Sequence, residues 1–405
     1  MKKLLFTISI AAFQYCGAQV TLVGMSSHGG FGNHGTIYSI NTAGSLDTLF
    51  NFKDGLNGCS PMGNLVQDAD GNLYGVTASC GSNGGGTLFK YNKKNHAVTT
   101  LVNFSVEIGG GPLGSLTFGS DGNLYGMTNV GGANSAGTIF KCSTDGVLTI
   151  LESFGGKDGA NPVGSLKEGA DGNFYGMTRM GGEFNKGVVF KYSPFGMYTV
   201  LHSFNGLDGA APQGDVALVK DSILYGVTTN GGTYNGGAVF SCSTSGKFQT
   251  LNSFNSSTGT TPFGSLLNAE DGYLYGTTYA SGANYFGTLF RCDYNGKISV
   301  LTNFDNTNGA NPMSTLAMAS DGNIYGTTSN GGSTKAQAGV IFRYNTTSNL
   351  YTTIYQFDEN GPQSAQGGVI EMISERQPNV MAAAGKATHK HTMRKTSHGK
   401  TGTAE

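Results

Sequence analysis

An eight-residue motif that recurs about every fifty residues constrains the fold of this chain more than any other feature. Its copies read DGNLYGVT, DGNLYGMT, DGNFYGMT, DSILYGVT, DGYLYGTT and DGNIYGTT, and they begin at Asp70, Asp121, Asp171, Asp221, Asp271 and Asp321. The motif tyrosines, from Tyr74 to Tyr325, are spaced by 51 residues once and by 50 residues four times. A strict period of this length is typical of repeat proteins. It predicts one large domain assembled from like units.

Each unit is predicted to form four short β-strands. In the unit of residues 112–154 the segments GSLTFGS, NLYGMT, TIFKCS and VLTILESF are rich in β-branched and aromatic residues, and turn-forming segments separate them. Consecutive apolar residues such as Ile139 and Phe140 need cover on both faces of their strand. Four-stranded sheets arranged radially supply that cover, so we expect an all-β protein, a β-propeller of four-stranded blades.

The two ends of the repeat region complement each other. The segment LVGMSSHGG at residues 22–30 matches a second strand and its loop, but no first strand precedes it. The segment GGVIEM at residues 367–372 resembles a first strand and stands at the other end. Pairing the two segments closes the ring and removes an exposed sheet edge, whereas an open solenoid needs caps at both ends. We therefore predict seven blades, with one blade shared between N- and C-terminal strands.

Composition and the terminal segments indicate the compartment. Residues 1–18 contain two lysines, an apolar stretch and small residues near Ala18, which predicts a secretory signal peptide. No other segment has the length and apolar character of a transmembrane helix. The net charge of -1 argues against nucleic acid as a partner. We expect a secreted, extracellular monomer with its propeller over residues 19–376 and a basic, low-complexity, disordered tail over residues 377–405.

The five cysteines that follow the predicted signal peptide fall into two groups. Cys142, Cys242 and Cys292 occupy one repeat position, where other units have tyrosine, and this indicates a packing site. Cys59 and Cys80 lie in loops of the same unit and are candidates for a disulfide in an oxidising compartment. Sequence alone leaves their pairing open, because it does not give the distance between them.

At this level of detail the units resemble the GloVer tandem repeat of secreted bacterial proteins. The resemblance rests on the segments DGNLYGMTNVGG, GTIFKCSTDGVLTILESF and DGANPVGSL, and it extends over about residues 22–370. It implies a repeat protein with no established reaction and with a frequent C-terminal surface anchor. Residues 377–405 do not match such an anchor, which leaves association with the cell surface open.

Variable loops supply the candidate binding residues. The Gly-rich loops between second and third strands are expected on the same face as the connections between blades. Aromatic rings with neighbouring amides suit the C–H surfaces and hydroxyls of sugars and also protein hot spots. The alternative is that each aromatic ring folds back over its own blade. The candidates are Phe31, Asn33, Phe184, Asn185, Tyr234, Asn235, Asn284, Tyr285 and Phe286.

Metal-binding and catalytic patterns are weak. Asp54, Asp158 and Asp208 in the inter-blade connections are weak candidates for Ca²⁺, but each loop has a single acidic residue and Asp-Gly is an ordinary turn. His28 and His34 flank one loop without a partner at metal-ligand spacing. Because the chain has no HExxH, GxSxG or phosphate-loop motif, we assign no catalytic residue and expect no metal or other cofactor.

The function expected from these observations is non-catalytic binding. The protein is predicted to act as a binding or interaction module for an extracellular polysaccharide or protein. One alternative is an extracellular propeller enzyme of the lyase or glycosidase type, which requires a catalytic cluster that breaks the regularity of the ring at one mouth of the channel. Another alternative is a structural surface protein. The repeated motif itself is interpreted as framework, with Asp-Gly turning the chain and the tyrosine packing between blades.

Overall fold

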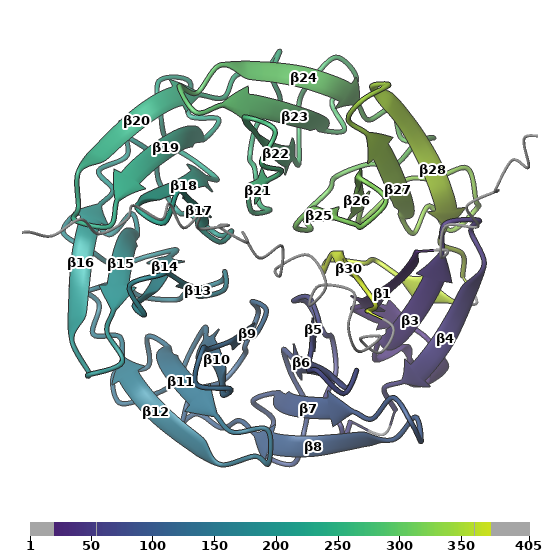
Figure 1. The fold of residues 1–405 in the computed structure, drawn as a ribbon, viewed down its shortest axis with the longest axis horizontal. Coiled ribbons are helices and arrows are strands. Elements are labelled where there is room, and N and C mark those ends of the chain that lie inside the picture. Colours follow the sequence, from purple (N-terminus) through teal and green to yellow (C-terminus); the bar gives the residue numbers. More distant parts are fainter. Residues whose placement is uncertain (1–19, 54, 360, 374–405) are drawn as a thin grey trace, which may run out of the picture.

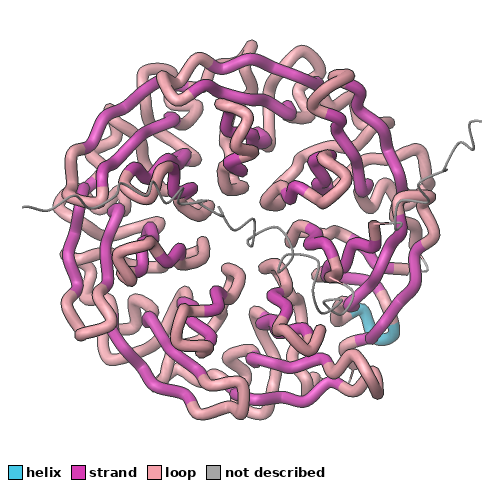
Figure 2. Tube along the Cα trace, in the orientation of Figure 1, coloured by secondary structure: helices cyan, strands magenta, loops and turns pink. Residues whose placement is uncertain are grey.

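The blades of this protein form a closed ring. The computed structural model describes residues 20–53, 55–359 and 361–373, and it arranges seven four-stranded antiparallel sheets around a central channel (Figure 1). Figure 2 shows strands and loops almost throughout, with one 3-10 turn, η1 (Phe31–Asn33), among the described residues. The predicted all-β, seven-bladed propeller is confirmed. The expected signal peptide and tail lie outside the described residues.

In blades 1 to 6 the strands run from the channel to the outside of the ring in chain order. Blade 1 contains β5 (Val66–Gln67), β6 (Leu73–Thr77), β7 (Thr87–Tyr91) and β8 (Val98–Asn103). Blade 2 contains β9 (Thr117–Phe118), β10 (Leu124–Thr128), β11 (Thr138–Cys142) and β12 (Leu148–Ser153). Blade 3 contains β13 (Lys167–Glu168), β14 (Phe174–Thr178), β15 (Val188–Tyr192) and β16 (Tyr198–Ser203).

The second half of the ring repeats this order. Blade 4 contains β17 (Ala217–Val219), β18 (Ile223–Thr228), β19 (Ala238–Ser243) and β20 (Phe248–Ser253). Blade 5 contains β21 (Leu267–Asn268), β22 (Tyr273–Thr278), β23 (Thr288–Asp293) and β24 (Ile298–Asn303). Blade 6 contains β25 (Ala317–Met318), β26 (Asn323–Thr327), β27 (Val340–Asn345) and β28 (Leu350–Gln356).

The seventh blade, called the closing blade here, joins both ends of the repeat region. It contains β30 (Val369–Glu371), β1 (Thr21–Ser26), β3 (Thr36–Asn41) and β4 (Leu46–Asn51), in that order. The short strands β2 (His28–Gly29) and β29 (Pro362–Gln363) add a second pairing between the ends. Glu371 also accepts a hydrogen bond from the N–H of Ser320 (2.7 Å) in blade 6. The blade shared between N- and C-terminal strands, predicted from the sequence, is confirmed.

The motif aspartate and tyrosine hold the turn before the second strand. In blade 3, Asp171 accepts hydrogen bonds from the N–H of Asn173 (3.1 Å) and from the hydroxyl of Tyr175 (2.6 Å). The same tyrosine-to-aspartate bond recurs in blades 2, 5 and 6 at 2.9, 2.7 and 2.7 Å. The ring of Tyr175 is fully buried against Val216 and Leu224 of the next blade. The motif therefore serves as framework, as its sequence indicates.

The motif glycine leaves room for an aromatic ring on the adjacent strand. Gly126 lies opposite Phe140 in the register of β10 and β11, and a Cβ on Gly126 would lie 2.5 Å from the ring carbon Cζ. Phe140 fills that space and packs on Phe104 and Tyr74 of blade 1. Because every blade has such a pair, the apolar core consists of clusters between neighbouring blades.

The three cysteines that are unpaired in the described part of the chain belong to this core. Cys142, Cys242 and Cys292 are fully buried, and they are free thiols. Burial raises the pKa of the Cys142 thiol to about 11, which keeps it protonated and inert at neutral pH. The packing role inferred from the repeat position agrees with this environment. Among the described residues no helix is long and apolar enough to span a membrane.

Candidate functional site

A ring of glycines narrows the central channel where each connection enters an inner strand. The glycines are Gly63, Gly114, Gly164, Gly214, Gly264 and Gly367, and blade 6 has Ser314 in this position. A Cβ on Gly63 would lie 2.6 Å from the carbonyl oxygen of Gly114, and one on Gly214 would lie 2.8 Å from that of Gly264. Backbones of neighbouring blades therefore meet here, and a side chain at these glycines would push the blades apart.

The residue after each glycine links neighbouring blades by a hydrogen bond. Ser115 donates its N–H to Oγ of Ser165 (2.7 Å), and Ser165 donates its N–H to Oδ1 of Asp215 (2.5 Å). Asp215 in turn donates its N–H to Oγ of Ser265 (2.7 Å), and Asn64 donates to Ser115 (2.8 Å). These bonds join neighbouring blades at the ring of glycines, so this part of the channel is rigid.

A pocket lies against this ring of glycines, on the side of the inter-blade connections. Residues that directly follow the glycine position line it through Asn64, Ser115, Ser165, Asp215, Ser265 and Thr315, so one carboxylate borders the pocket. The residue before the glycine position lines it too, and these residues are called the mouth ring here: Met62, Leu113, Val163, Gln213, Phe263, Met313 and Gln366. Five of these side chains are apolar, two are amides, and all are half-buried. The pocket has a volume of about 160 Å³. This equals the liquid volume of about five water molecules, enough for one small group.

A second set of variable residues surrounds the mouth ring. These residues directly follow the motif threonine or serine and are called the rim ring: Ser27, Ala78, Asn129, Arg179, Thr229, Tyr279 and Ser329. Gln213 donates a hydrogen bond from Nε2 to Oγ1 of Thr229 (3.1 Å), and the rings of Phe263 and Tyr279 meet edge to face at 5.2 Å. The two rings therefore form one continuous surface at the mouth of the channel.

Positive charge collects on one side of this mouth. Arg179 and Lys186 are exposed and border a depression of about 520 Å³ between blades 3 and 4, together with Asn185 and Asn235. Neither cation takes part in the ion pairs found in the described part of the chain. Glu183 is the acidic residue of the same loop. An anionic group seated in this depression would meet a guanidinium that makes no ion pair among the described residues, while the carboxylate of Asp215 lines the mouth pocket.

The loops that the sequence singled out lie on the same face as this mouth. The loop after each second strand pairs with the inter-blade connection, as in the bridges Ala160 to Met180 and Ala210 to Asn230. Phe31, Phe184, Tyr234 and Tyr285 are exposed by 74%, 49%, 63% and 79%. They belong to four different blades. The structure thus spreads these aromatic rings around the loop face rather than bringing them to one point.

The remaining predicted loop residues have structural contacts. Asn33, Asn185 and Asn235 each accept a backbone N–H of their own loop, at 2.7, 2.9 and 3.1 Å. Their φ angles are 59°, 52° and 54°, a conformation that asparagine tolerates better than most residues. Phe286 packs against the cluster between blades 5 and 6, while Asn284 is exposed.

The aspartates considered for metal binding close their own loops. Asp158 accepts the N–H of Gly155 (2.7 Å), and Asp208 accepts the N–H of Asn205 (2.9 Å). Asp208 also contacts Nε2 of His202 at 2.9 Å. Burial lowers the pKa of His202, although the hydrogen bond and charge of the Asp208 carboxylate oppose this. Asp54 lies outside the described residues.

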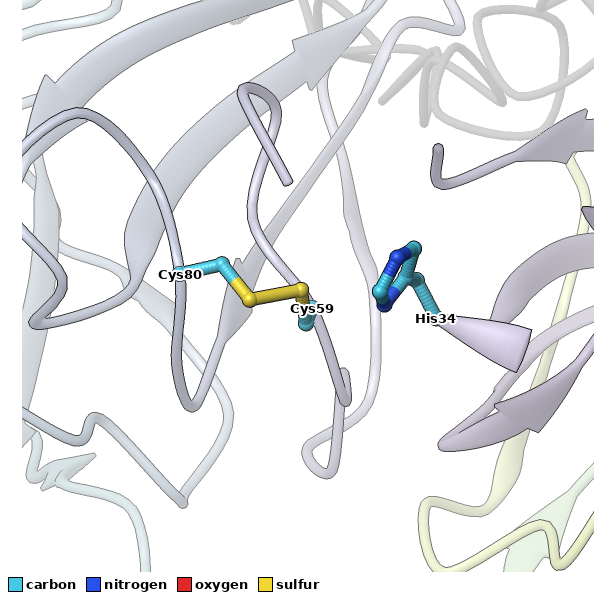
Figure 3. A group of neighbouring side chains, drawn as sticks. All are labelled: His34, Cys59 and Cys80. Carbon is cyan, nitrogen blue, oxygen red and sulfur yellow. A yellow bond between two sulfur atoms is a disulfide. The ribbon is translucent and has the colours of Figure 1, made fainter. Parts of the chain in front are cut away.

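The candidate cysteine pair is bonded in the structure. Cys59 and Cys80 form a disulfide with their Cα atoms 5.3 Å apart, and His34 lies beside it (Figure 3). The bond joins the connection entering blade 1 to the loop after β6.

Sequence reasoning did not identify the mouth ring or the rim ring as a site. A signal for both was present, because these two positions vary from blade to blade inside segments that otherwise repeat. What the sequence does not show is that connections from seven blades bring these positions to one axis. Arg179 and Phe263 are the residues that this signal would have added to the candidates.

Comparison with solved structures supports the architecture. A provisionally assigned 6-phosphogluconolactonase from Bacteroides fragilis NCTC 9343 has a TM-score of 0.54 and 15% identity, over 87% of this chain and 97% of that chain. A functionally unknown protein from Desulfotomaculum acetoxidans DSM 771 has a TM-score of 0.51 and 11% identity, over 87% of this chain and 99% of that chain. At these identities the likeness shows the fold alone.

Comparison of sequences identifies the repeat. No curated protein is significantly similar to this chain. The sequence profile of the Gloeobacter/Verrucomicrobia repeat, however, matches residues 12–185 and 164–390. These two matches overlap and together include all of the blades. The chain therefore belongs to the Gloeobacter/Verrucomicrobia repeat family.

Proposed function

We propose that this protein is a non-catalytic, exported binding module that holds an acidic sugar of an extracellular polysaccharide at the mouth of its channel. One observation carries the proposal. The mouth ring, whose residues differ between blades, lines a single pocket, and the equally variable rim ring contacts it where Gln213 meets Thr229 and Phe263 meets Tyr279. Variation gathered around one pocket is the pattern expected of a ligand site on a repeated scaffold.

The chemistry of the mouth suits a sugar ring. Phe263, Met62 and Met313 offer apolar surface for the C–H face of a pyranose, and the amides of Gln213 and Gln366 offer partners for its hydroxyls. This combination of apolar walls with a few polar groups is usual for small-molecule sites.

Arg179 accounts for the acidic character of the proposed ligand. A guanidinium binds a carboxylate through two parallel hydrogen bonds, and Arg179 has no competing ion pair among the described residues. The depression between blades 3 and 4 is lined by Arg179 and by Asn185 and Asn235, which directly follow the exposed Phe184 and Tyr234 in the chain. Neighbouring sugars of the same chain would follow this path, which adds contacts to those of a small pocket.

Export is part of the proposal because polysaccharide ligands lie outside the cell. The predicted signal peptide of residues 1–18 supports it, and so does the disulfide between Cys59 and Cys80, since disulfides persist mainly in oxidising compartments. We propose that the exported protein acts as a monomer.

The test is binding of the mature chain, residues 19–405, to immobilised neutral and uronate-containing polysaccharides. The Arg179→Ala variant is expected to weaken uronate binding about tenfold and to reduce its dependence on salt. Phe263→Ala is expected to weaken binding of any sugar at the mouth. The matched control is Lys247→Ala, because Lys247 is an exposed cation in the turn between β19 and β20 on the opposite face.

Three outcomes would contradict the proposal. Equal loss of binding in the Arg179 and Lys247 variants would indicate non-specific attraction to charge. Binding that is unchanged by both the Arg179 and the Phe263 variants would place the ligand elsewhere. Release of shortened oligosaccharides by the unmodified protein would favour the enzyme alternative.

A further inference from the structure

A histidine and two cysteines from three different loops meet where the closing blade touches blade 1 (Figure 3). His34 lies between β1 and β3, Cys59 lies in the connection from β4 to β5, and Cys80 lies between β6 and β7. Each side chain offers one metal-ligand atom, and these atoms lie within 4.8 Å of one another. Ser60 donates its N–H to the carbonyl oxygen of His34 (2.9 Å), which holds the two loops together independently of the disulfide.

The fold does not require a covalent bond at these positions. In blade 5 the residues equivalent to Cys59 and Cys80 are Thr260 and Ser281, and their hydroxyl oxygens form a hydrogen bond of 2.9 Å. The same backbone therefore accepts two side-chain atoms that are close but not bonded. Two separate sulfur atoms can occupy these positions in blade 1 without a change of the ring.

We propose that reduction converts this junction into a Zn²⁺ site. A dithiol reductant passes two electrons and two protons to the disulfide, becomes a disulfide itself, and leaves thiols at Cys59 and Cys80. Zn²⁺ then binds both thiolates and the neutral imidazole of His34, which releases the two thiol protons. Water completes the four-coordinate shell that zinc prefers, with about 2.3 Å to sulfur and about 2.0 Å to nitrogen.

This site would link parts of the ring that the disulfide leaves separate. The disulfide joins the connection before β5 to the loop after β6, whereas His34 belongs to the closing blade. A metal held by all three residues therefore fastens the closing blade to blade 1. The inference is independent of sugar binding at the mouth of the channel, because none of its three residues lines that pocket.

The experiment uses the full mature chain and Co²⁺ as the spectroscopic probe for zinc. One sample is reduced with a phosphine, which is then removed without air, and the other stays oxidised. The reduced protein is expected to bind one Co²⁺ with thiolate-to-cobalt charge-transfer absorption and tetrahedral d–d bands, and Zn²⁺ is expected to displace it. The oxidised protein is expected to show neither band.

Two variants test whether the Co²⁺ absorption comes from this site or from other residues of the protein. Cys59→Thr combined with Cys80→Ser copies the pair of blade 5, keeps the buried thiols of Cys142, Cys242 and Cys292, and is expected to abolish the charge-transfer band. His34→Ala keeps both thiols and is expected to weaken Co²⁺ binding at least about tenfold and to shift the d–d bands.

The melting temperature provides a second readout. Zn²⁺ is expected to raise the melting temperature of the reduced protein and to leave that of the double variant unchanged, because a ligand that binds only the folded state stabilises it. The proposal is overturned if the reduced protein and the double variant bind equal amounts of Co²⁺. Unfolding of the protein on reduction, or Co²⁺ binding that is insensitive to His34→Ala, would overturn it as well.

Discussion

Two buried tyrosine hydroxyls of this ring have opposite environments. Tyr175 donates its hydroxyl hydrogen to the carboxylate of Asp171 (2.6 Å). Tyr38 occupies the position that is phenylalanine in the other blades, and its hydroxyl is a buried polar atom for which the described residues supply no partner. Burial raises the pKa of both phenols, so both are neutral at ordinary pH. The same functional group should therefore stabilise one blade and destabilise another.

Replacing Tyr175 by Phe is expected to lower the free energy of unfolding by about 1.5–3 kcal/mol, because it removes a hydrogen bond to a charged group. Asp171 would also lose a donor that holds its pKa down. Urea denaturation of the purified variant and of the unmodified protein measures the difference. A change smaller than the experimental error would show that the turn does not depend on this bond.

Replacing Tyr38 by Phe is expected to raise the free energy of unfolding by about 1 kcal/mol, because an unsatisfied buried hydroxyl costs stability. The Phe ring already fits this place in other blades, where it lies against the strand glycine as Tyr38 lies against Gly24. The same denaturation experiment tests both tyrosines. A destabilised Tyr38→Phe variant would reveal a partner for the hydroxyl.

His202 gives stability a dependence on pH. Its ring stacks on Phe248 with centroids 3.5 Å apart, and burial lowers its pKa from the ordinary value of 6.5. As the pH falls below about 6.5, the unfolded chain takes up a proton that the folded chain resists, so stability falls. We expect the His202→Gln variant to lose less stability than the unmodified protein between pH 7 and pH 5. The melting temperatures of both proteins are measured across that range. Parallel dependence on pH in the two proteins would contradict this role of His202.

At the scale of the strands, a glycine on the second strand and an aromatic ring on the third form the unit that repeats around the ring. Gly126 in β10 and Phe140 in β11 are such a pair, and the ring of Phe140 fills the space that a Cβ on Gly126 would take. Because the same ring also reaches the preceding blade, a clash in one sheet would disturb the packing between two sheets.

Replacing Gly126 by Ala is therefore expected to lower the free energy of unfolding by about 1–3 kcal/mol, the usual cost of overpacking a core. Gly155→Ala is the matched control, because the nearest atom to a Cβ there lies at 3.5 Å and its backbone has no positive φ. Equal stability of the two variants would mean that Phe140 moves aside without cost.

At the scale of the whole molecule, stability depends on closing the ring. β30 covers the free edge of β1 through the pairs Leu22 to Glu371 and Gly24 to Val369, and Val369 is fully buried. Glu371 also holds Ser320 of blade 6 through its carboxylate. Loss of this strand would expose one sheet edge and the core on both sides of the closing blade.

Deleting residues 367–373 is expected to lower the free energy of unfolding by more than about 3 kcal/mol, since it removes a buried valine and a whole edge pairing. Deleting residues 378–405 serves as the control and is expected to leave the melting temperature nearly unchanged. Thermal denaturation compares both truncations with the mature chain. Equal melting temperatures of the two truncations would contradict closure by β30.

The strands and their number could be predicted because the information is local and repeated. Each unit carries its own turn residues and its own β-branched and aromatic segments, and the first strand missing before residues 22–30 reappears at residues 367–372. The packing role of Cys142 followed in the same way, from what the equivalent positions hold. Such properties need no knowledge of distances between units.

By itself, the sequence determined the architecture of this protein: the period sets the blade, the count of units sets the ring, and the split unit sets its closure. Only the tertiary structure decided which residues share a site. The channel mouth joins Met62, Arg179 and Phe263, which lie in different blades, and the junction in Figure 3 joins His34 to a disulfide. The physical reason is that strand pairing acts between neighbours in the chain, whereas a ring brings one position of every blade to a common axis.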